Sequence, residues 1–295
     1  MKVFVTGSSS RLAAALLPRL CDEPGIEQVT GIDLAAPNYR HAKFRASLMD
    51  FRSPELESVV QGHEGFVHLG FVVLRGRMPE QDMFDINVTG SLKAFHSAHR
   101  AGAHRLIHLS SAAVYGGGVH LREDAPLQPL PGFLYGQHKA RLERLLELEF
   151  PGCVRLRSHV ILGPGAQPLL RQLLNQPFYV RLSEPHPLLQ CVHEDDVARA
   201  VCSALLRDVH GAFNLATEDS FTFRDALRRR HWLTLPLPPA AAKAGVRLAW
   251  NFSGWGGEPA WVDGLTRTLL LNCRRSALEL GWRSTRSAFE VLDQT

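Results

Sequence analysis

The first half of the chain alternates short apolar runs with amphipathic stretches, and no other feature of the sequence constrains the fold as strongly. The apolar runs predict strands, which lie at residues 3–5, 29–34, 65–69, 105–110 and 154–157. The amphipathic stretches predict helices, which lie at residues 12–20, 83–101 and 139–149. Strands that alternate with helices form a parallel sheet with helices on both faces. We therefore predict an α/β fold built on a doubly wound parallel sheet.

Composition limits the class of protein and its partners. With 295 residues, of which 45% are hydrophobic and 21% charged, the chain can bury a sizeable core. The net charge of +4 comes without a long basic run, so nucleic acid is not an expected partner. No apolar run reaches about 18 residues, so no membrane partner is expected either. Five scattered cysteines without a CxxC pair favour a reducing, cytoplasmic setting over a disulfide scaffold or a cysteine zinc site.

The segment from Val3 to Ala13 has the pattern of a strand, a turn of small residues and the start of a helix. Free backbone N–H groups at the N-terminus of such a helix attract the pyrophosphate of a dinucleotide. The usual pattern has three glycines, whereas here Gly7 is followed by Ser10 and Ala13 at the other two places. Ser10 adds a side chain where backbone must approach phosphate, although its hydroxyl can donate a hydrogen bond. A serine-rich helix N-cap explains this turn equally well.

Asp33 ends the second predicted strand, 26 positions after Gly7. An acid about 20 residues after the phosphate turn accepts hydrogen bonds from the adenosine ribose and repels a 2′-phosphate. Leu34 and Ala35 follow, so no basic residue stands ready for that phosphate, and NAD is favoured over NADP. Arg11, which lies in the turn itself, could reverse this preference. An ordinary strand-end aspartate is the alternative interpretation.

A serine, a tyrosine and a lysine follow in an order that suits acid–base chemistry. Ser111 comes directly after the strand at 105–110, and Tyr135 and Lys139 are spaced i, i+4, which places them on one face of a helix. A phenol titrates near pH ~10 in water, and a nearby lysine cation favours its phenolate. Tyr135 can then exchange a proton with a substrate hydroxyl while hydride moves to or from the cofactor. Ser111 would hold the substrate oxygen, and Lys139 would also bind the nicotinamide ribose.

Several segments together resemble the extended short-chain dehydrogenase/reductases, also described as the NAD-dependent epimerase/dehydratase family. The matching segments follow the family's order and are Val5–Gly7, Gly31–Asp33, Val67–Leu69, Asn87–Gly90, Leu109–Gly116, Tyr135–Lys139, Gly163–Gly165, Val192–Ala198 and Glu279–Trp282. The resemblance implies that Ser111, Tyr135 and Lys139 form the catalytic triad. It also implies that Asn87 is the fourth, helix-bending residue, which supports the lysine through water.

The resemblance further implies where the cofactor is held and how the protein assembles. The residues expected to bind it, besides Tyr135 and Lys139, are Gly7, Ser9, Ser10, Arg11, Leu12, Asp33, Leu34, Ser47, Leu48, Leu69, Gly70 and Phe71. Ser47 stands where many members carry an acid for the adenine amine, and Asp50 is the alternative partner. Members commonly dimerise through the two helices that here are predicted at 83–101 and 135–149. A homodimer is therefore expected, with apolar surface from Leu142, Leu145, Leu146 and Leu148.

The pattern of strands and helices loosens after about residue 163, where prolines break the chain into short pieces. We expect a Rossmann-type NAD(P)-binding domain formed by residues 1–163 and about 188–216. A smaller, discontinuous substrate-binding domain would comprise about 164–187 and 217–295. Trp250, Trp255 and Trp261 are predicted to pack in the core of this smaller domain, and a lid over an apolar substrate is the alternative.

Two positions depart from the pattern of members that act on nucleotide sugars. Those members carry an Asn and an Arg that bind the substrate diphosphate, and the corresponding residues here are Val160 and Leu189. Apolar side chains cannot replace the hydration that an oxyanion loses on binding. In the loop at 71–79, Arg75 and Arg77 either meet an acidic substrate group or are ordinary solvated arginines. The departures predict a substrate other than a nucleotide sugar.

Three functional hypotheses follow from the sequence. The first is an NAD(P)-dependent oxidoreductase that interconverts an alcohol and a carbonyl on a small, moderately apolar molecule. The second is an NAD-dependent nucleotide-sugar epimerase or dehydratase, which shares the first oxidation step. The third is a non-catalytic NAD(P)-binding sensor, which the altered glycine turn suggests and which would not need the Ser, Tyr and Lys set. None of the three requires a metal, and no HExxH spacing occurs.

Overall fold

A seven-stranded parallel sheet forms the centre of the molecule, with the strand order β12-β7-β5-β4-β1-β2-β3. The computed structural model describes residues 1–181, 185–253 and 260–295. The strands of the sheet are β1 (Lys2–Thr6), β2 (Gln28–Asp33), β3 (Phe44–Leu48), β4 (Gly65–His68), β5 (Arg105–Ser111), β7 (Val154–Ser158) and β12 (Gly211–Leu215). This arrangement confirms the predicted doubly wound α/β fold of Rossmann type.

Two strands of the sheet, β3 and β12, were not predicted from the sequence, and both lie at its edges. Strand β3 has the sequence FRASL and is almost entirely exposed, so it lacks the apolar run that marks a central strand. Strand β12 is buried but contains a glycine and an asparagine in five residues. An edge strand pairs on one side alone and needs fewer apolar residues, which is why the pattern missed both.

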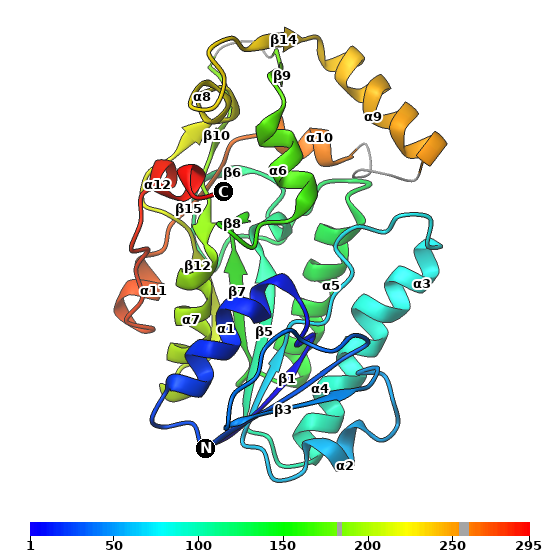
Figure 1. Ribbon diagram of the computed structural model, residues 1–295, viewed down its shortest axis with the longest axis vertical. Coiled ribbons are helices and arrows are strands. Elements are labelled where there is room, and N and C mark those ends of the chain that lie inside the picture. The colour runs from blue at the N-terminus through cyan, green and yellow to red at the C-terminus, as the bar shows by residue number, and fades with distance from the viewer. Residues whose placement is uncertain (182–184, 254–259) are drawn as a thin grey trace.

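Helices cover the two faces of the sheet (Figure 1). On one face, α1 (Arg11–Asp22) packs against α7 (Glu194–Leu206). The other face carries α2 (Leu56–Val60), α4 (Ser91–Arg100) and α5 (Leu134–Glu149), which close over a core containing Phe4, Phe66 and Phe95. The carboxyl ends of the strands face the upper part of the molecule in Figure 1, so a ligand at this edge would lie between the sheet and that upper part.

The single helix predicted at 83–101 is interrupted. It consists of α3 (Glu80–Phe84), a π-helical segment (Asp85–Gly90) and α4. The widened turn lets the buried Asn87 reach across to the loop after β4, where its amide bonds the backbone of Val72. Because that contact is tertiary, the periodicity of the sequence could not reveal the interruption.

The upper part of the molecule is built from short elements joined by loops. A 3-10 turn (Ala112–Val114) follows β5. The remaining strands form four pairs, which are β6 (Gly118–Leu121) with β15 (Leu269–Leu271), β8 (Ile161–Leu162) with β11 (Val192–His193), β9 (Phe178–Val180) with β14 (Leu235–Leu237), and β10 (Leu188–Leu189) with β13 (Phe221–Thr222). The remaining helices are α6 (Pro168–Asn175), α8 (Phe223–Arg228), α9 (Pro239–Ser253), α10 (Ala260–Leu265), α11 (Arg274–Leu278) and α12 (Ala288–Asp293).

The side chains of Trp250, Trp255 and Trp261 lie outside the described part of the chain. Within the described residues, no helix is long and apolar enough to cross a membrane.

The start of α7 ties the C-terminal segment to the sheet. The buried Asp196 accepts hydrogen bonds from the backbone N–H and the hydroxyl of Thr285, at 3.0 and 2.7 Å, and its own carbonyl accepts one from the Trp282 indole at 2.6 Å. Burial alone would raise the pKa of Asp196, but the bonds from Thr285 outweigh it and lower the pKa. His193 caps the helix by accepting the Asp195 N–H at 3.1 Å. Asp196 therefore connects the start of α7, which His193 caps, to the C-terminal segment.

Candidate active site

The phosphate turn packs closely against the end of β4. Gly7 has φ +73°, and a Cβ atom on it would lie 2.7 Å from the backbone nitrogen of Gly70. Ser10 is the N-cap of α1 and accepts the Ala13 N–H at 3.3 Å, so its hydroxyl oxygen caps the helix as the alternative interpretation expected. Among the described residues, no hydrogen bond uses the N–H groups of Arg11 and Leu12. Two unused donors in the first turn of a helix fit the pyrophosphate of a dinucleotide.

Asp33, at the end of β2, lies next to this phosphate turn. Its carboxylate accepts the Ser9 N–H at 2.9 Å and the Leu34 N–H at 2.7 Å, which fixes its position and leaves lone pairs for ribose hydroxyls. Leu48 lies opposite Asp33 in the β2–β3 register. The side chains of Leu34 and Leu48 are 74% and 68% exposed, although both are apolar. An acid flanked by two exposed leucines fits a ribose with an adenine ring beside it.

The alternative adenine partner, Asp50, is already engaged. Its carboxylate accepts three hydrogen bonds from the Arg52 guanidinium, two from Nε at 3.0 and 3.1 Å and one from Nη2 at 2.6 Å, and this pairing lowers the pKa of Asp50. Ser47 is exposed at the end of β3, next to Leu48. Of the two residues considered for the adenine amine, Ser47 is therefore the one that keeps its side chain unpaired in the described hydrogen bonds.

The predicted serine, tyrosine and lysine converge at the end of β5. The Ser111 hydroxyl lies near enough to the Tyr135 hydroxyl to lower the pKa of the phenol, and it accepts the Ala113 N–H at 3.2 Å. Gly136 permits this approach, because a Cβ atom there would lie 3.1 Å from the Ala113 carbonyl oxygen. Lys139 Nζ donates to the Leu109 carbonyl at 2.6 Å and lies 5.8 Å from the centre of the Tyr135 ring. Tyr135 and Lys139, which follow Ser111 by 24 and 28 positions in the sequence, thus form one cluster with it.

Burial dominates the electrostatics of this cluster. It raises the pKa of Tyr135 to about 12, against a smaller lowering effect of the bond from Ser111. It lowers the pKa of Lys139 to about 7, against a raising effect of Glu143. In this state Tyr135 is a protonated phenol at neutral pH and can act as an acid. To act as a base, it needs additional positive charge nearby.

The loop after β4 carries the residues that meet this cluster from the other side. The Phe71 ring lies under the Lys139 ammonium, 3.5 Å from Nζ to the ring centre. The amide of Asn87 accepts the Val72 N–H at 2.7 Å and donates to the Val72 carbonyl at 2.9 Å. Asn87 therefore bends its helix as expected and holds the loop, and no described hydrogen bond joins its side chain to Lys139.

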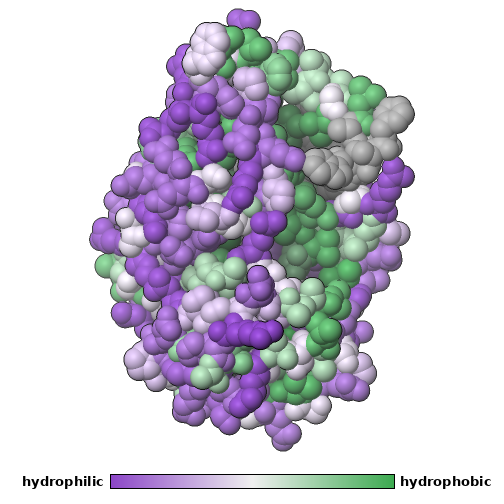
Figure 2. All heavy atoms as spheres, in the orientation of Figure 1, coloured by the Kyte–Doolittle hydropathy of each residue, from purple (hydrophilic) through white to green (hydrophobic). Residues whose placement is uncertain are grey.

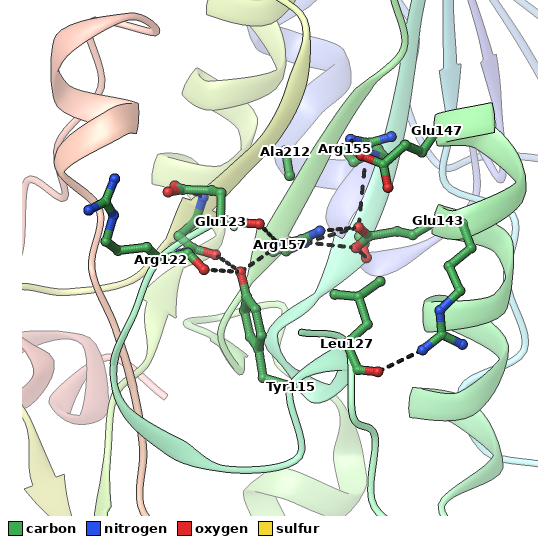
Figure 3. Close-up of polar contacts among 12 residues, drawn as sticks. Tyr115, Arg122, Glu123, Leu127, Glu143, Glu147, Arg155, Arg157 and Ala212 are labelled. Carbon is green, nitrogen blue, oxygen red and sulfur yellow. Dashed lines mark hydrogen bonds and ion pairs between the residues drawn. The ribbon is translucent and has the colours of Figure 1, made fainter. Parts of the chain in front are cut away.

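A buried ion-pair network, which the sequence did not predict, lies one helical turn below Lys139 (Figure 3). Glu143 is 1% exposed and accepts hydrogen bonds from Arg157 Nε and Nη2 at 2.9 and 2.7 Å. Ser110, the neighbour of Ser111, donates its hydroxyl to the same carboxylate. Arg157 also donates to the Tyr115 hydroxyl at 2.7 Å. Glu143 thus joins α5, β5 and β7 directly behind the cluster of Ser111, Tyr135 and Lys139.

In the sequence, this network is represented by Glu143, four residues after Lys139 on a predicted helix, and by Arg157 in a predicted strand. Either residue alone is typical of a solvated surface. Burial would lower the pKa of Arg157, but the Glu143 carboxylate outweighs it and raises that pKa above its ordinary value. Arg157 therefore stays charged inside the protein.

On the substrate side, the two departures from the nucleotide-sugar pattern lie in one apolar cluster. Leu189 is buried in β10, and Val160 packs against the same group, which includes Leu162 and Phe221. Arg75, in the loop after β4, donates to the Met78 carbonyl at 3.1 Å and lies 3.7 Å from Glu80, so it is engaged within its own loop. Val160 and Leu189 are thus packed among apolar side chains, and neither offers a polar side-chain group.

The expected dimer surface offers little apolar area. Leu142 and Leu146 are buried in the protein's own core, and Leu145 is half-buried. Leu148 is 80% exposed and is the main apolar side chain of α5 left for a partner. The homodimer stays a prediction.

Comparisons with known proteins agree with this fold. A model described as the NAD dependent epimerase/dehydratase family matches residues 3–216, and the protein belongs to this family. The uncharacterized protein Rv0501 of Mycobacterium tuberculosis is 24% identical over 99% of this chain and 82% of its own length. The UDP-glucose 4-epimerase of Azospirillum brasilense is 32% identical over 49% of this chain and 43% of its own length.

Solved structures share the fold over the whole chain. MoeE5 in complex with UDP-glucuronic acid and NAD has a TM-score of 0.78 and 19% identity, covering 100% of this chain and 97% of that one. DesIV, a dTDP-glucose 4,6-dehydratase from Streptomyces venezuelae with NAD and TYD bound, has a TM-score of 0.77 and 20% identity, covering 100% and 95%. At this level of identity the similarity shows that the fold is shared. Both of those solved structures contain NAD.

Proposed function

We propose that the protein is an NAD-dependent oxidoreductase that transfers hydride at an alcohol or carbonyl carbon, with Tyr135 as the acid/base. The observation that carries the proposal is the cluster at the end of β5, where Ser111 is near enough to Tyr135 to lower the pKa of its hydroxyl and Lys139 lies one helical turn away. Bound NAD would supply the hydride acceptor. Ser111 would bond the substrate oxygen, and Tyr135 would give or take its proton.

The choice of NAD rests on Asp33, whose anchored carboxylate would repel a 2′-phosphate. A cytoplasmic location is supported by the cysteines, because all five are free thiols and four of them are buried. The proposed substrate is a small, moderately apolar molecule. Figure 2 shows hydrophobic residues in a hollowed area on the face where the upper part of the molecule meets the lower part. Val160 and Leu189 pack in a hydrophobic cluster with Leu162 and Phe221.

A nucleotide-sugar epimerase or dehydratase is the second candidate, because the similarity to UDP-glucose 4-epimerase reaches 32% over about half of the chain. The two reactions differ in net redox change. The proposed oxidoreductase accumulates free NADH when it oxidises an alcohol, whereas an epimerase returns the hydride to its substrate. Steady-state NADH formation over a panel of secondary alcohols and nucleotide sugars therefore tests the proposal, and turnover of a nucleotide sugar without NADH release would contradict it.

Ligand-induced stabilisation gives a test that needs no turnover. We expect UDP-glucose and UDP-glucuronic acid to leave the melting temperature of the NAD-bound protein unchanged, because the apolar Val160 and Leu189 offer the diphosphate no partner. A known UDP-glucose 4-epimerase measured in parallel is the positive control. A stabilisation of several degrees (~1 kcal/mol or more) would favour the epimerase instead.

A further inference from the structure

We infer that Phe71 is a positioning residue for Lys139. The face of the Phe71 ring holds the lysine ammonium in a buried place beside Tyr135. The inference assigns a new role at the site of the proposed function and rests on that function for its catalytic meaning. From the sequence, Phe71 was expected to contact the cofactor, and its neighbours in the loop to line the substrate pocket.

The geometry places Phe71 between the two reactive side chains. Lys139 Nζ lies 3.5 Å from the centre of the Phe71 ring, well within the range of a cation–π contact. The rings of Phe71 and Tyr135 meet edge to face, with centroids 5.7 Å apart and an interplanar angle of 88°. One aromatic side chain therefore contacts both the general acid/base and the lysine that assists it.

The position of Phe71 is fixed by the next residue in the chain. Asn87, which is completely buried, uses its amide as both donor and acceptor to the backbone of Val72. Two hydrogen bonds from one buried side chain hold the Val72 peptide groups in place. The π-helical segment that presents Asn87 thus serves Lys139 through the loop that carries Phe71.

The surroundings of Lys139 leave the ring as a main partner of the cation. Lys139 is 3% exposed, and its one described hydrogen bond goes to the Leu109 carbonyl. The charged or titratable groups that face it are Glu143 and Tyr135 on its own helix, His108 on β5 and, beyond His108, His68 on β4 and Arg155 on β7. Burial lowers the pKa values of both histidines, so they stay neutral, and neither competes for the ammonium as an anion would.

Two replacements of Phe71 separate the effect of the aromatic ring on the pKa of Lys139 from the effect of desolvation. Phe71→Leu keeps the site apolar but removes the negative face of the ring, so the ammonium loses a partner and the pKa of Lys139 should fall. Phe71→Ala opens space for water next to the ammonium, so desolvation weakens and the pKa should rise from about 7. Phe71→Tyr keeps a ring face and should leave the pKa close to the wild-type value.

The experiment measures the pKa of Lys139 in the protein without added cofactor or substrate. The lysine is labelled competitively with acetic anhydride over a series of pH values, and its peptide is quantified by mass spectrometry. We expect a fall of roughly one unit for Phe71→Leu and a rise of at least about one unit for Phe71→Ala. Phe178→Leu, a replacement of a partly exposed phenylalanine in β9, is the matched control and should shift nothing.

The outcomes separate this inference from the proposed function. Shifts in opposite directions support it, whereas no shift, or shifts of one sign for both variants, would overturn it. If Phe71→Ala does not fold, the comparison of Phe71→Leu with Phe71→Tyr decides, because those two differ mainly in the ring face. If the pKa values shift as expected while wild-type protein shows no hydride transfer, the positioning role stands and the proposed function fails.

Discussion

Replacing Tyr135 with phenylalanine is expected to lower kcat by about 10²–10⁴-fold and to leave the affinity for NADH unchanged. The hydroxyl is the group whose pKa the neighbouring Ser111 lowers and that would exchange a proton with the substrate. The ring contact with Phe71 is kept in the variant, so the site keeps its shape. NADH formation and nicotinamide fluorescence, measured on the same preparation, give the two quantities.

Tyr39→Phe is the matched control, because Tyr39 is also a tyrosine whose pKa burial raises to about 12, but it lies in the loop between β2 and β3. It should keep full turnover. A readout without substrate is the ultraviolet absorbance of tyrosinate, titrated with and without NAD. The cofactor's positive ring should lower the pKa of one tyrosine in the wild type and of none in Tyr135→Phe. Normal turnover in Tyr135→Phe would contradict the assigned acid/base role.

Glu143→Gln is expected to have the largest effect on stability, with a loss of about 3–5 kcal/mol in the free energy of unfolding. The carboxylate is 1% exposed and is the partner of Arg157, whose guanidinium is also buried. Without the charge of Glu143, Arg157 becomes a buried cation with the neutral Tyr115 hydroxyl and a backbone carbonyl as its remaining described partners. Denaturant unfolding of both proteins measures the difference.

Glu147 offers a control on the same helix, one turn further on (Figure 3). It is bonded to Arg155 at 3.2 Å, but its side chain is 65% exposed, so Glu147→Gln should cost about 0–1 kcal/mol. Combining Glu143→Gln with Arg157→Leu should recover part of the loss, because it removes the unpaired cation. Equal effects of Glu143→Gln and Glu147→Gln would show that the buried network does not stabilise the fold.

Glu143→Gln should also lower kcat in the protein that remains folded. Ser110, which donates to Glu143, is the neighbour of Ser111, and Glu143 lies one turn from Lys139 on α5. Loss of the charge removes a group that raises the pKa of Lys139, so a smaller fraction of the lysine is cationic at neutral pH. The pH profile of kcat should shift accordingly, which a purely structural defect would not produce.

The sequence predicted the parts of this protein that local patterns encode. Strands β1, β4 and β5 are largely buried and contain short apolar runs, whereas β3 does not, because it is an exposed edge strand. Tyr135 and Lys139 could be paired because their spacing on one helix fixes their relation. The approach of Ser111 to that pair was expected from the family order of the motifs.

Contacts between distant segments could not be predicted in this way. Glu143 reads as an ordinary helix acid until β7 brings Arg157 against it from 14 residues further along the chain. Phe71 reads as one more apolar loop residue until α5 places Lys139 over its ring. The π-helical segment around Asn87 depends on Val72, 15 residues earlier. Each of these features needs the assembled fold, because each depends on a contact between separate elements.

The most direct test of the central claim, a dinucleotide site that serves Tyr135, is a titration of the purified protein with NADH and, separately, NADPH, followed by nicotinamide fluorescence. The account predicts micromolar binding of NADH and at least roughly tenfold weaker binding of NADPH, because Asp33 repels the additional phosphate. A preference for NADPH would contradict the role of Asp33 and shift it to Arg11. If neither nucleotide binds and the denatured protein releases none, the site does not hold a dinucleotide, and the proposed chemistry fails with it.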